Sequence, residues 1–477
     1  MKKGEIIKNV EIEKLVFGGK GFAKLKSENI DDNGKTIFIT GGAIPGSIVN
    51  LKVLKKRKDY LETQIVDIIK KSNIEKKHPN NIYGECGGCK WVNIPYENQL
   101  EIKENQVKES FFHIKKFQED INIQSIIPSP IIDGYRNKVE FSFGKYISHK
   151  ENKQEHFNVG FHKQGSFSQI EDFDGCILTD ELTNKIYKEI KDFAKQSGLP
   201  VYDQKPQIGF FRHILIRRTF FSNEIMIVLG YNPDYNEGKY ELNKIQDFLK
   251  NLPNKYNEIK SIYLSPNGNK ADVAIGELDL IYGTKSIKEN LLGLNFDISP
   301  KSFFQTNSLG ADKLYSKVIE LANKEKLKDY TVLDLYAGTG TIGMFFSNLG
   351  AKKVYSIELS TQASEDGKKN AKTNSLNNIE FINSKVEDFL TKYLEEKKKA
   401  DLLIIDPPRA GINPKALPNI LKFKTNQIIY VSCNPATLSR DLGFIIQNSD
   451  YKIETVVPVD MFPHTHHIET IVSLIRK

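Results

Sequence analysis

The chain has 477 residues, of which 39% are hydrophobic and 27% charged, and a formal net charge of +8 at pH 7. This length predicts two to four domains with buried cores, and the mild positive charge permits a polyanionic partner without by itself indicating one. No apolar run approaches the roughly 20 residues that span a bilayer, and the stretch MKKGEIIKNVEIEK lacks the apolar core of a secretory signal, so we expect a cytoplasmic protein that does not bind membranes.

Residues 1–70 form the first predicted domain. Short apolar runs broken by glycines, with Val49, Leu51 and Val53 alternating with polar neighbours, predict the strands of a small β-barrel. The run from Lys55 to Lys58 puts four cations close to Tyr60. Two interpretations stay open for this run, an edge strand protected by lysines and a surface that binds nucleic acid.

Residues 71–295 form a second predicted domain of mixed α/β structure. It begins with a linker over residues 71–95 that contains the motif ECGGC, and a helix is expected from Tyr96 to about Lys116. In the segment FFRHILIRRTF (210–220), Arg212, Arg217 and Arg218 flank alternating apolar residues. We expect these arginines to form a basic face that contacts RNA phosphates.

Residues 296–477 form the third predicted domain, in which strand and helix patterns alternate. This order predicts a doubly wound, mostly parallel sheet that ends in an antiparallel pair. The expected strands cover 330–338, 352–360, 379–384, 400–409, 427–433, 451–459 and 467–476, and the helices between them cover 341–350, 363–376, 386–399, 414–423 and 436–446. The predicted fold class is therefore α/β, with a small β-barrel in front and a mixed α/β domain between.

Polar residues follow the predicted parallel strands where each strand ends. In such a sheet, ligands bind outside the carboxyl ends of the strands, and packing alone would scatter these residues. Their convergence predicts an active site built from Asp334, Tyr336, Gly338, Gly340, Gly343, Glu358, Asp406, Arg409 and Cys433.

The motif GTGTIG, which starts at Gly338, is typical of a nucleotide-binding turn between a strand and a helix. Glu358 lies 20 residues beyond Gly338, a spacing suited to binding ribose hydroxyls. Both NAD and S-adenosylmethionine enzymes share this geometry. Two features favour S-adenosylmethionine. The motif lies late in the chain, behind two other domains, and it is followed by the sequences DPPR and SCNP, which hydride transfer does not need.

Cys433 stands at the end of a predicted strand and before a helix, whose N-terminus would lower the pKa of the thiol. This position favours a nucleophile over an inert core thiol. Methyl transfer to carbon 5 of a pyrimidine needs such a nucleophile at carbon 6, followed by removal of the carbon-5 proton by a base. Glu469 in HTHHIETIV is the candidate base, and a surface glutamate on an edge strand is the open alternative.

These motifs together resemble the RNA uracil-5-methyltransferase family, through FFQTN (303–307), LDLYAGTGTIG, IELS, DPPRAG, SCNPATLSRDL and HIETIV. The resemblance covers the whole catalytic domain and implies a Rossmann-like domain that methylates uridine in RNA. It implies that S-adenosylmethionine is bound by Gln305, Tyr336, Glu358 and Asp406, next to Asp334, Gly338 and Gly340. It also implies that Cys433 is the nucleophile and Glu469 the base.

The first domain resembles a TRAM domain, an RNA-binding module. Together with ECGGC it resembles the 23S ribosomal RNA branch of the family more than the transfer RNA branch. RNA cytosine-5-methyltransferases resemble this plan but carry a second cysteine in the loop where this chain has DPPR, so the resemblance favours uracil over cytosine. The expected product is 5-methyluridine in 23S ribosomal RNA, with no obligate protein partner. The alternatives are a transfer RNA uridine, an NAD-type oxidoreductase, and a non-catalytic RNA-binding or redox-sensing module.

The ribosomal branch that the chain resembles usually holds a 4Fe–4S cluster on four cysteines. Cys86, Cys89 and Cys176 match three of these positions, but the first is Asn80. A cluster with an outside ligand, a Cys3His zinc site with His78, and a vestigial site all stay open. The histidines of HTHH (464–467) are expected in a polar loop beside the active site rather than on a metal.

Overall fold

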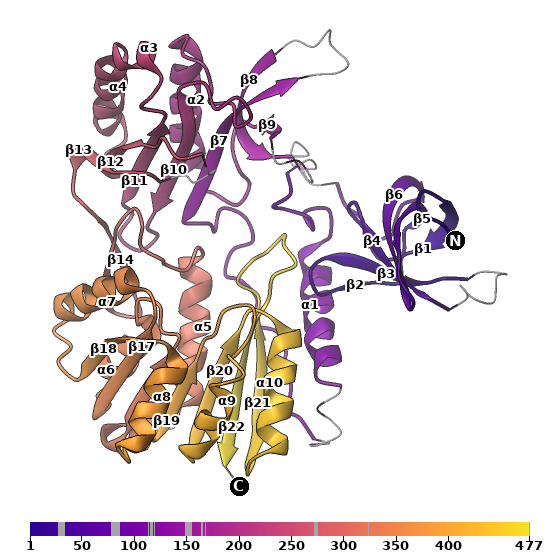
Figure 1. Ribbon diagram of the computed structural model, residues 1–477, viewed down its shortest axis with the longest axis vertical. Coiled ribbons are helices and arrows are strands. Elements are labelled where there is room, and N and C mark those ends of the chain that lie inside the picture. Colours follow the sequence, from indigo (N-terminus) through magenta and orange to yellow (C-terminus); the bar gives the residue numbers. More distant parts are fainter. Residues whose placement is uncertain are drawn as a thin grey trace.

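The computed structural model describes residues 1–26, 34–77, 86–112, 114, 118, 120–147, 155–163, 166, 168–270, 275–322 and 324–476. Figure 1 shows three lobes, which are a small strand-rich lobe from the N-terminal part, a central α/β lobe, and a C-terminal α/β lobe. None of the helices in these residues combines the length and the apolar character needed to cross a bilayer. The α/β fold class, with its strand-rich N-terminal domain, is confirmed.

The N-terminal lobe is a barrel-like sheet in the order β1-β5-β6-β4-β3-β2. Alternating buried and exposed positions, such as buried Val49, Leu51 and Val53, give it an apolar interior. The cationic run from Lys55 to Lys58 is exposed where β5 turns into β6. The residue pairs between β5 and β1 end at Lys52, whereas those between β5 and β6 continue to Lys56, so both interpretations of this run stay open. The strands are β1 (Ile6–Glu11), β2 (Lys14–Val16), β3 (Lys20–Lys24), β4 (Thr36–Thr40), β5 (Ile48–Lys56) and β6 (Tyr60–Lys70).

The central lobe has a seven-stranded sheet in the order β13-β12-β11-β10-β7-β8-β9, in which only β11 and β12 are paired in parallel. Helices α2 and α4 pack on β10 and β12. The elements are β7 (Lys138–Ile147), β8 (Glu155–His162), β9 (Ile170–Asp172), α2 (Glu181–Gln196), β10 (Phe211–Arg218), β11 (Ile225–Tyr231), α3 (Asn236–Lys239), α4 (Leu242–Lys255), β12 (Ile259–Pro266) and β13 (Asp279–Gly283).

The C-terminal lobe is the predicted doubly wound sheet, in the order β18-β17-β16-β19-β20-β22-β21, with β22 antiparallel to both neighbours. A hairpin of β14 (Ile287–Leu291) and β15 (Leu294–Ile298), helix α5 (Ser308–Leu321) and a 3-10 helix (Lys324–Asp329) precede it. The sheet and its helices are β16 (Thr331–Leu335), α6 (Thr341–Asn348), β17 (Lys353–Glu358), α7 (Thr361–Thr373), β18 (Ile379–Asn383), α8 (Val386–Glu395), β19 (Leu402–Ile405), α9 (Leu417–Lys422), β20 (Gln427–Ser432), α10 (Pro435–Gln447), β21 (Tyr451–Val459) and β22 (Glu469–Arg476).

The helix expected from Tyr96 is α1 (Tyr96–Ser110), which ends before the predicted Lys116. Val107 on α1, and Phe111 and Ile114 just after it, are buried in one apolar cluster with the C-terminal sheet. Ile123 and Ile127 form bridges to β21. These parts of the chain therefore pack on the C-terminal lobe, and the domain boundaries at 70 and 295 stay a prediction.

The basic face expected on β10 is wrong for Arg212 and Arg217. Arg212 is buried, donates to the backbone carbonyls of Asn267 and Asn269 at 2.6 and 2.7 Å, and lies 4.3 Å from the Tyr202 ring centroid. Arg217 is also buried and donates to a backbone carbonyl, while Arg218 pairs with Asp180. The guanidinium groups of Arg212 and Arg217 satisfy buried acceptors, so these two are not available to RNA. Arg218 is partly exposed, and its contact with RNA stays a prediction.

Arg212→Met is therefore expected to lower stability and to leave RNA affinity unchanged. Two carbonyls lose their donor, and each buried acceptor without a partner costs about 1–3 kcal/mol. Thermal unfolding and filter binding of RNA measure the two effects. The control Arg57→Met, at an exposed turn, should leave the unfolding midpoint unchanged, and a loss of RNA affinity in folded Arg212→Met would contradict this assignment.

Candidate active site

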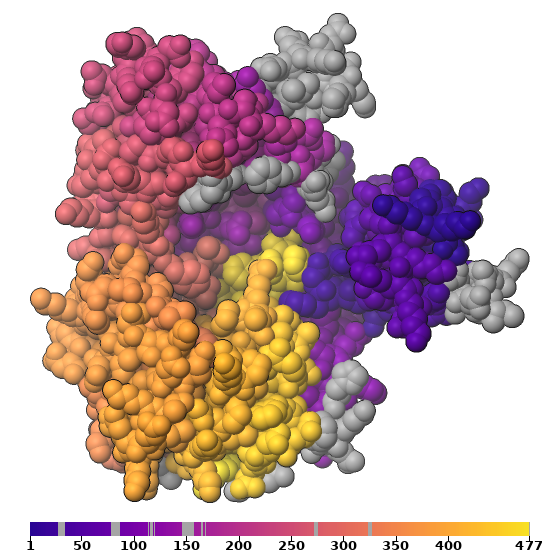
Figure 2. All heavy atoms as spheres, in the orientation of Figure 1, coloured from indigo at the N-terminus to yellow at the C-terminus, as the bar shows by residue number. Residues whose placement is uncertain are grey.

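A cavity of about 560 Å³ opens where β16, β19 and β20 end. Figure 2 shows one face of the molecule, on which the central and C-terminal lobes meet. Helix α5 and the segment that precedes β22 close its sides, contributing Tyr315, Phe462 and Thr465. Most of the predicted site residues line this cavity, namely Gln305, Asp334, Tyr336, Gly338, Asp406, Arg409, Cys433 and Glu469.

The glycine-rich turn between β16 and α6 requires its glycines. Gly338 and Gly340 have φ of 57° and 70°, in the left-handed region, and a Cβ on Gly340 would lie 2.4 Å from the Phe381 ring. A Cβ on Gly343 would lie 2.7 Å from an Asp334 carboxylate oxygen. A side chain at Gly340 or Gly343 would therefore collide with its neighbours, so the turn requires glycine at both positions.

Two carboxylates hold this turn by accepting hydrogen bonds from its backbone amides. Asp334 is buried and accepts hydrogen bonds from the Gly343 amide at 3.0 Å and the Ser356 hydroxyl at 3.2 Å. Burial raises the pKa of Asp334 to about 7. Glu358 accepts from the Gly338 amide at 2.9 Å and from the Ser360 amide at 2.7 Å.

Glu358 does not line the first cavity but a second one of about 680 Å³. The two cavities share Tyr336, Asp406 and Pro408, so they form one elongated binding region along the carboxyl ends of the strands. Gly340 lines neither cavity and instead serves as the N-cap of α6. The region has room for a nucleoside at the Glu358 end and for a reacting group at the Cys433 end.

Cys433 follows β20 and is half-buried at the start of α10, whose N-cap is Asn434. The sequence predicts a lowered thiol pKa, and this prediction is wrong. Burial, and then the nearby carboxylates of Glu469 and Asp406, raise the pKa of Cys433 to about 11, while Arg409 opposes them. Burial of the thiol and the two carboxylates both disfavour the thiolate, opposite to the effect expected from the helix N-terminus.

Glu469 is the first residue of β22 and is buried, not on the surface. Since β22 runs antiparallel to β20, with Thr470 opposite Ser432, its first residue lies at the same end as Cys433. Burial and the nearby Asp406 raise the pKa of Glu469 well above its ordinary value, and Arg409 opposes them. The edge-strand surface alternative for Glu469 is therefore wrong.

Glu469→Gln should make Cys433 a more reactive thiol. Removing the negative charge of Glu469 lowers the thiol pKa, so the thiolate fraction rises at any pH below that pKa. We expect the pH midpoint of Cys433 alkylation by iodoacetamide, followed on the Cys433 peptide by mass spectrometry, to fall relative to the wild type. Glu454→Gln, an exposed carboxylate on β21, is the matched control, and an equal midpoint in Glu469→Gln would contradict the coupling.

The segment that carries Gln305 is held by the central lobe. Asn137 donates its side-chain amide to the Gln305 carbonyl and to the Ser308 hydroxyl, both at 2.8 Å. Arg217 donates to the Ser302 carbonyl. Buried polar residues of the central lobe, on β10 and just before β7, therefore position the segment that forms one wall of the cavity. The sequence alone did not indicate this connection.

Sequence reasoning also missed several residues of the cavity wall. Only HTHH, expected in a loop beside the site, pointed to part of this wall, and the structure confirms that position for Thr465 and His467. Burial, followed by neighbouring cations, lowers the pKa of His467 to about 3. The lining residues that the sequence did not single out include Arg136, Tyr315 and Phe462.

The structure brings the other three cysteines together. Burial raises the pKa of Cys89, and the nearby thiols of Cys176 and Cys86 raise it further. Across the described ranges, however, no group of three or more His, Cys, Asp or Glu residues is arranged to hold a metal ion. The three thiols alone therefore do not fit a metal or a cluster, and His78 and Asn80 lie outside the described residues.

Comparisons with known proteins agree with this geometry. Residues 95–477 match the family described as tRNA (Uracil-5-)-methyltransferase. An uncharacterized RNA methyltransferase of Caldanaerobacter subterraneus subsp. tengcongensis is 37% identical, with both chains fully covered, and one of Clostridium tetani is 37% identical over 100% of this chain and 99% of its own. The crystal structure of Pyrococcus abyssi tRNA (uracil-54, C5)-methyltransferase in complex with S-adenosyl-L-homocysteine has a TM-score of 0.73 and 27% identity, covering 98% of this chain and 100% of that chain. The chain belongs to the RNA uracil-5-methyltransferase family.

Proposed function

We propose that this RNA methyltransferase transfers a methyl group from S-adenosylmethionine to carbon 5 of a uridine, through a covalent adduct on Cys433. One observation carries the proposal. The thiol of Cys433 and the carboxylates of Glu469 and Asp406 lie at the ends of three adjacent strands and line a single cavity. They are close enough there for both carboxylates to raise the pKa of the thiol. The same cavity is lined by the glycine-rich turn. If the three groups served only for packing, there would be no reason for them to lie beside this turn.

The cavity residues fit S-adenosylmethionine. Asp334 lines the cavity, and its Oδ1 is buried without a hydrogen-bond partner among the described residues, so it can accept from a donor that enters there. We assign Gln305, Asp334 and Asp406 to the amino-acid end of this molecule. Glu358 and Tyr336, together with Gly338 and the glycine-rich turn, are assigned to its nucleoside end. When bound, S-adenosylmethionine supplies an electrophilic methyl group.

The residues at the other end of the cavity perform the remaining steps. The Cys433 thiolate forms a bond to carbon 6 of the uracil ring, and the electron pair moves to the carbon 5–carbon 4 enolate. Carbon 5 then accepts the methyl group and becomes tetrahedral, still carrying its hydrogen. Glu469 removes this proton, the double bond between carbons 5 and 6 returns, and Cys433 leaves as the thiolate.

The target base must leave its stack to reach Cys433, because the thiol lies inside a cavity. We propose that the substrate is 23S ribosomal RNA. The barrel-like lobe and the ECGGC segment support this branch, and the exposed cations at the β5–β6 turn would contact RNA phosphates. A transfer RNA is the second candidate, because the similarity to the Pyrococcus abyssi tRNA enzyme covers the barrel-like lobe as well.

The test uses unmodified transcripts of 23S ribosomal RNA and of transfer RNAs with S-adenosylmethionine carrying a labelled methyl group. Nucleoside analysis of each digested RNA identifies the product. Labelled 5-methyluridine from the ribosomal transcript supports the proposal. Labelled 5-methyluridine only in transfer RNA would support the proposed reaction but show that the substrate is transfer RNA. Label in a nucleoside other than 5-methyluridine would contradict the proposed reaction.

A further inference from the structure

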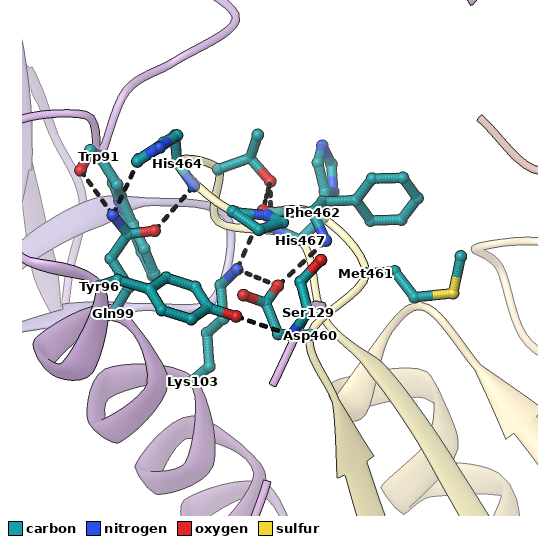
Figure 3. A network of polar contacts seen from close by, with 12 residues as sticks. Trp91, Tyr96, Gln99, Lys103, Ser129, Asp460, Met461, Phe462, His464 and His467 are labelled. Atoms are coloured by element: carbon teal, nitrogen blue, oxygen red, sulfur yellow. Dashed lines mark hydrogen bonds and ion pairs between the residues drawn. The ribbon is translucent and has the colours of Figure 1, made fainter. Parts of the chain in front are cut away.

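The segment 460–468 lies between β21 and β22 and leads directly into Glu469. Three of its residues, Phe462, Thr465 and His467, line the active-site cavity. It has no regular secondary structure of its own, so its position depends on side chains from elsewhere. Figure 3 shows that the main contacts come from α1, far away in the sequence.

Lys103 of α1 makes the first contact. Its ammonium group lies 2.7 Å from Asp460 Oδ1 and donates to the Phe462 carbonyl at 3.1 Å. Both side chains of the ion pair have no exposed surface. Burial lowers the pKa of Lys103, and the Asp460 carboxylate opposes this effect. A buried ion pair of this kind is poor evidence for stability but fixes the relative position of the two segments that carry it.

Gln99, one turn earlier on α1, makes the second contact. Its side-chain oxygen accepts from the His464 amide at 2.7 Å, and its nitrogen lies 3.1 Å from His464 Nδ1. The same nitrogen donates to the carbonyls of Trp91 and Ile94 at 3.1 and 2.8 Å. The backbone amide of Trp91 in turn donates to the His464 carbonyl at 3.1 Å. Gln99 therefore ties His464 to the N-terminal part of the chain.

The barrel-like lobe reaches the same segment. A Cβ on Gly19, in the β2–β3 turn, would lie 3.2 Å from the His466 side chain. The lobe is also fixed to α1, because Gln106 donates to the Leu15 carbonyl at 3.0 Å and Lys14 pairs with Glu109 at 2.7 Å. Figure 2 shows atoms of the barrel-like lobe (indigo) meeting those of the C-terminal segment (yellow). Helix α1 thus joins the barrel-like lobe to the wall of the active site.

We propose that Lys103 and Gln99 are positioning residues for methyl transfer, which hold the segment 460–468 so that its cavity-lining residues and Glu469 are in place. The proposal rests on the proposed function for its catalytic consequence. Neither residue lines the cavity, so neither contacts the reacting atoms. A displacement of about 1 Å at a reacting group reduces rate by up to about 100-fold, and loss of these contacts is expected to act in this way.

The test is the double variant Lys103→Met/Asp460→Asn. It removes the tie between α1 and the segment without leaving a buried charge unpaired. The introduced asparagine can still accept from the Phe462 amide, which Asp460 Oδ1 binds at 3.0 Å. We expect kcat to fall roughly 10- to 100-fold, with KM for S-adenosylmethionine unchanged. Lys108→Met, which removes an exposed pair with Glu104 on the same helix, is the control and should retain wild-type kcat.

A spectroscopic measurement tests the position of the segment without any reaction. Trp91 is the single tryptophan of the chain, is 1% exposed, and lies beside Lys103 and His464. Acrylamide quenching of its fluorescence should rise in the double variant and in Gln99→Leu, but not in Lys108→Met. This signal needs neither RNA nor methyl donor, so it decides the positioning role even if the proposed reaction proves wrong.

A folded double variant with wild-type kcat would overturn the proposal, as would a loss of kcat with unchanged Trp91 quenching. If the double variant does not fold, Gln99→Leu decides by the same two measurements, because it removes hydrogen bonds and no charge. A fall in kcat with unchanged KM, together with increased quenching, would establish Lys103 and Gln99 as positioning residues.

Discussion

Cys433→Ala is expected to lower kcat for methyl transfer by roughly 10⁴-fold or more, because the variant lacks the thiol that adds to carbon 6. Among the described cavity residues, Cys433 is the one thiol. The side chain is half-buried at a strand end rather than in the centre of a core. Removing one sulfur there should leave the fold intact, and the RNA affinity with it.

The measurement is single-turnover transfer of labelled methyl groups to RNA, with thermal unfolding and RNA binding measured on the same preparation. The pH dependence supplies a second check. Burial and two carboxylates raise the thiol pKa, so the fraction of reactive thiolate increases as pH rises, and kcat/KM should increase with it through neutral pH. Retention of more than about a tenth of the wild-type rate by folded Cys433→Ala would exclude a Cys433 nucleophile.

Glu469→Gln is expected to stop the reaction after methyl transfer and before release of the RNA. The amide cannot remove the carbon-5 proton, so the methylated base stays bonded to Cys433, and turnover falls by roughly 10²–10⁴-fold, the range for loss of a general base. The raised pKa of Glu469 means that its carboxylate form, and therefore proton removal in the wild type, is favoured as pH rises.

The adduct of Glu469→Gln with ordinary RNA should survive denaturation and appear as a slow band that carries the methyl label. Glu454→Gln, an exposed carboxylate on β21, should turn over normally and give no such band. Complete loss of methyl transfer in Glu469→Gln, with no adduct, would show that Glu469 acts before the methyl group moves, and its assignment as the base would fall.

The sequence predicted the C-terminal sheet well because hydrophobic runs and glycine-rich turns are local patterns. The strand at 330–338 and the helix at 341–350 correspond to β16 and α6. The position of Asp406 and Cys433 at one end of the sheet followed from the parallel order of their strands. The place of Glu469 did not, because it depends on the antiparallel pairing of β22 with β20.

Electrostatic environments were harder to predict, because they depend on contacts between distant residues. Arg212 and Arg217 were expected on a surface, but carbonyls from other segments surround them. The thiol of Cys433 was expected to be acidic from its place before a helix, but burial, and then the carboxylates of Glu469 and Asp406, raise its pKa. The helix from Tyr96 was expected, yet its packing on the C-terminal lobe was not visible in its sequence.

The most direct test of the account is to mix the protein with RNA that contains 5-fluorouridine, in the presence of S-adenosylmethionine. Fluorine at carbon 5 cannot be removed as a proton, so the adduct formed after methyl transfer should persist. The account predicts a denaturation-resistant complex that requires the methyl donor, in which mass spectrometry locates the fluorinated, methylated base on Cys433. Attachment at another residue, or 5-methyluridine formation from normal RNA without any trapped complex, would contradict it.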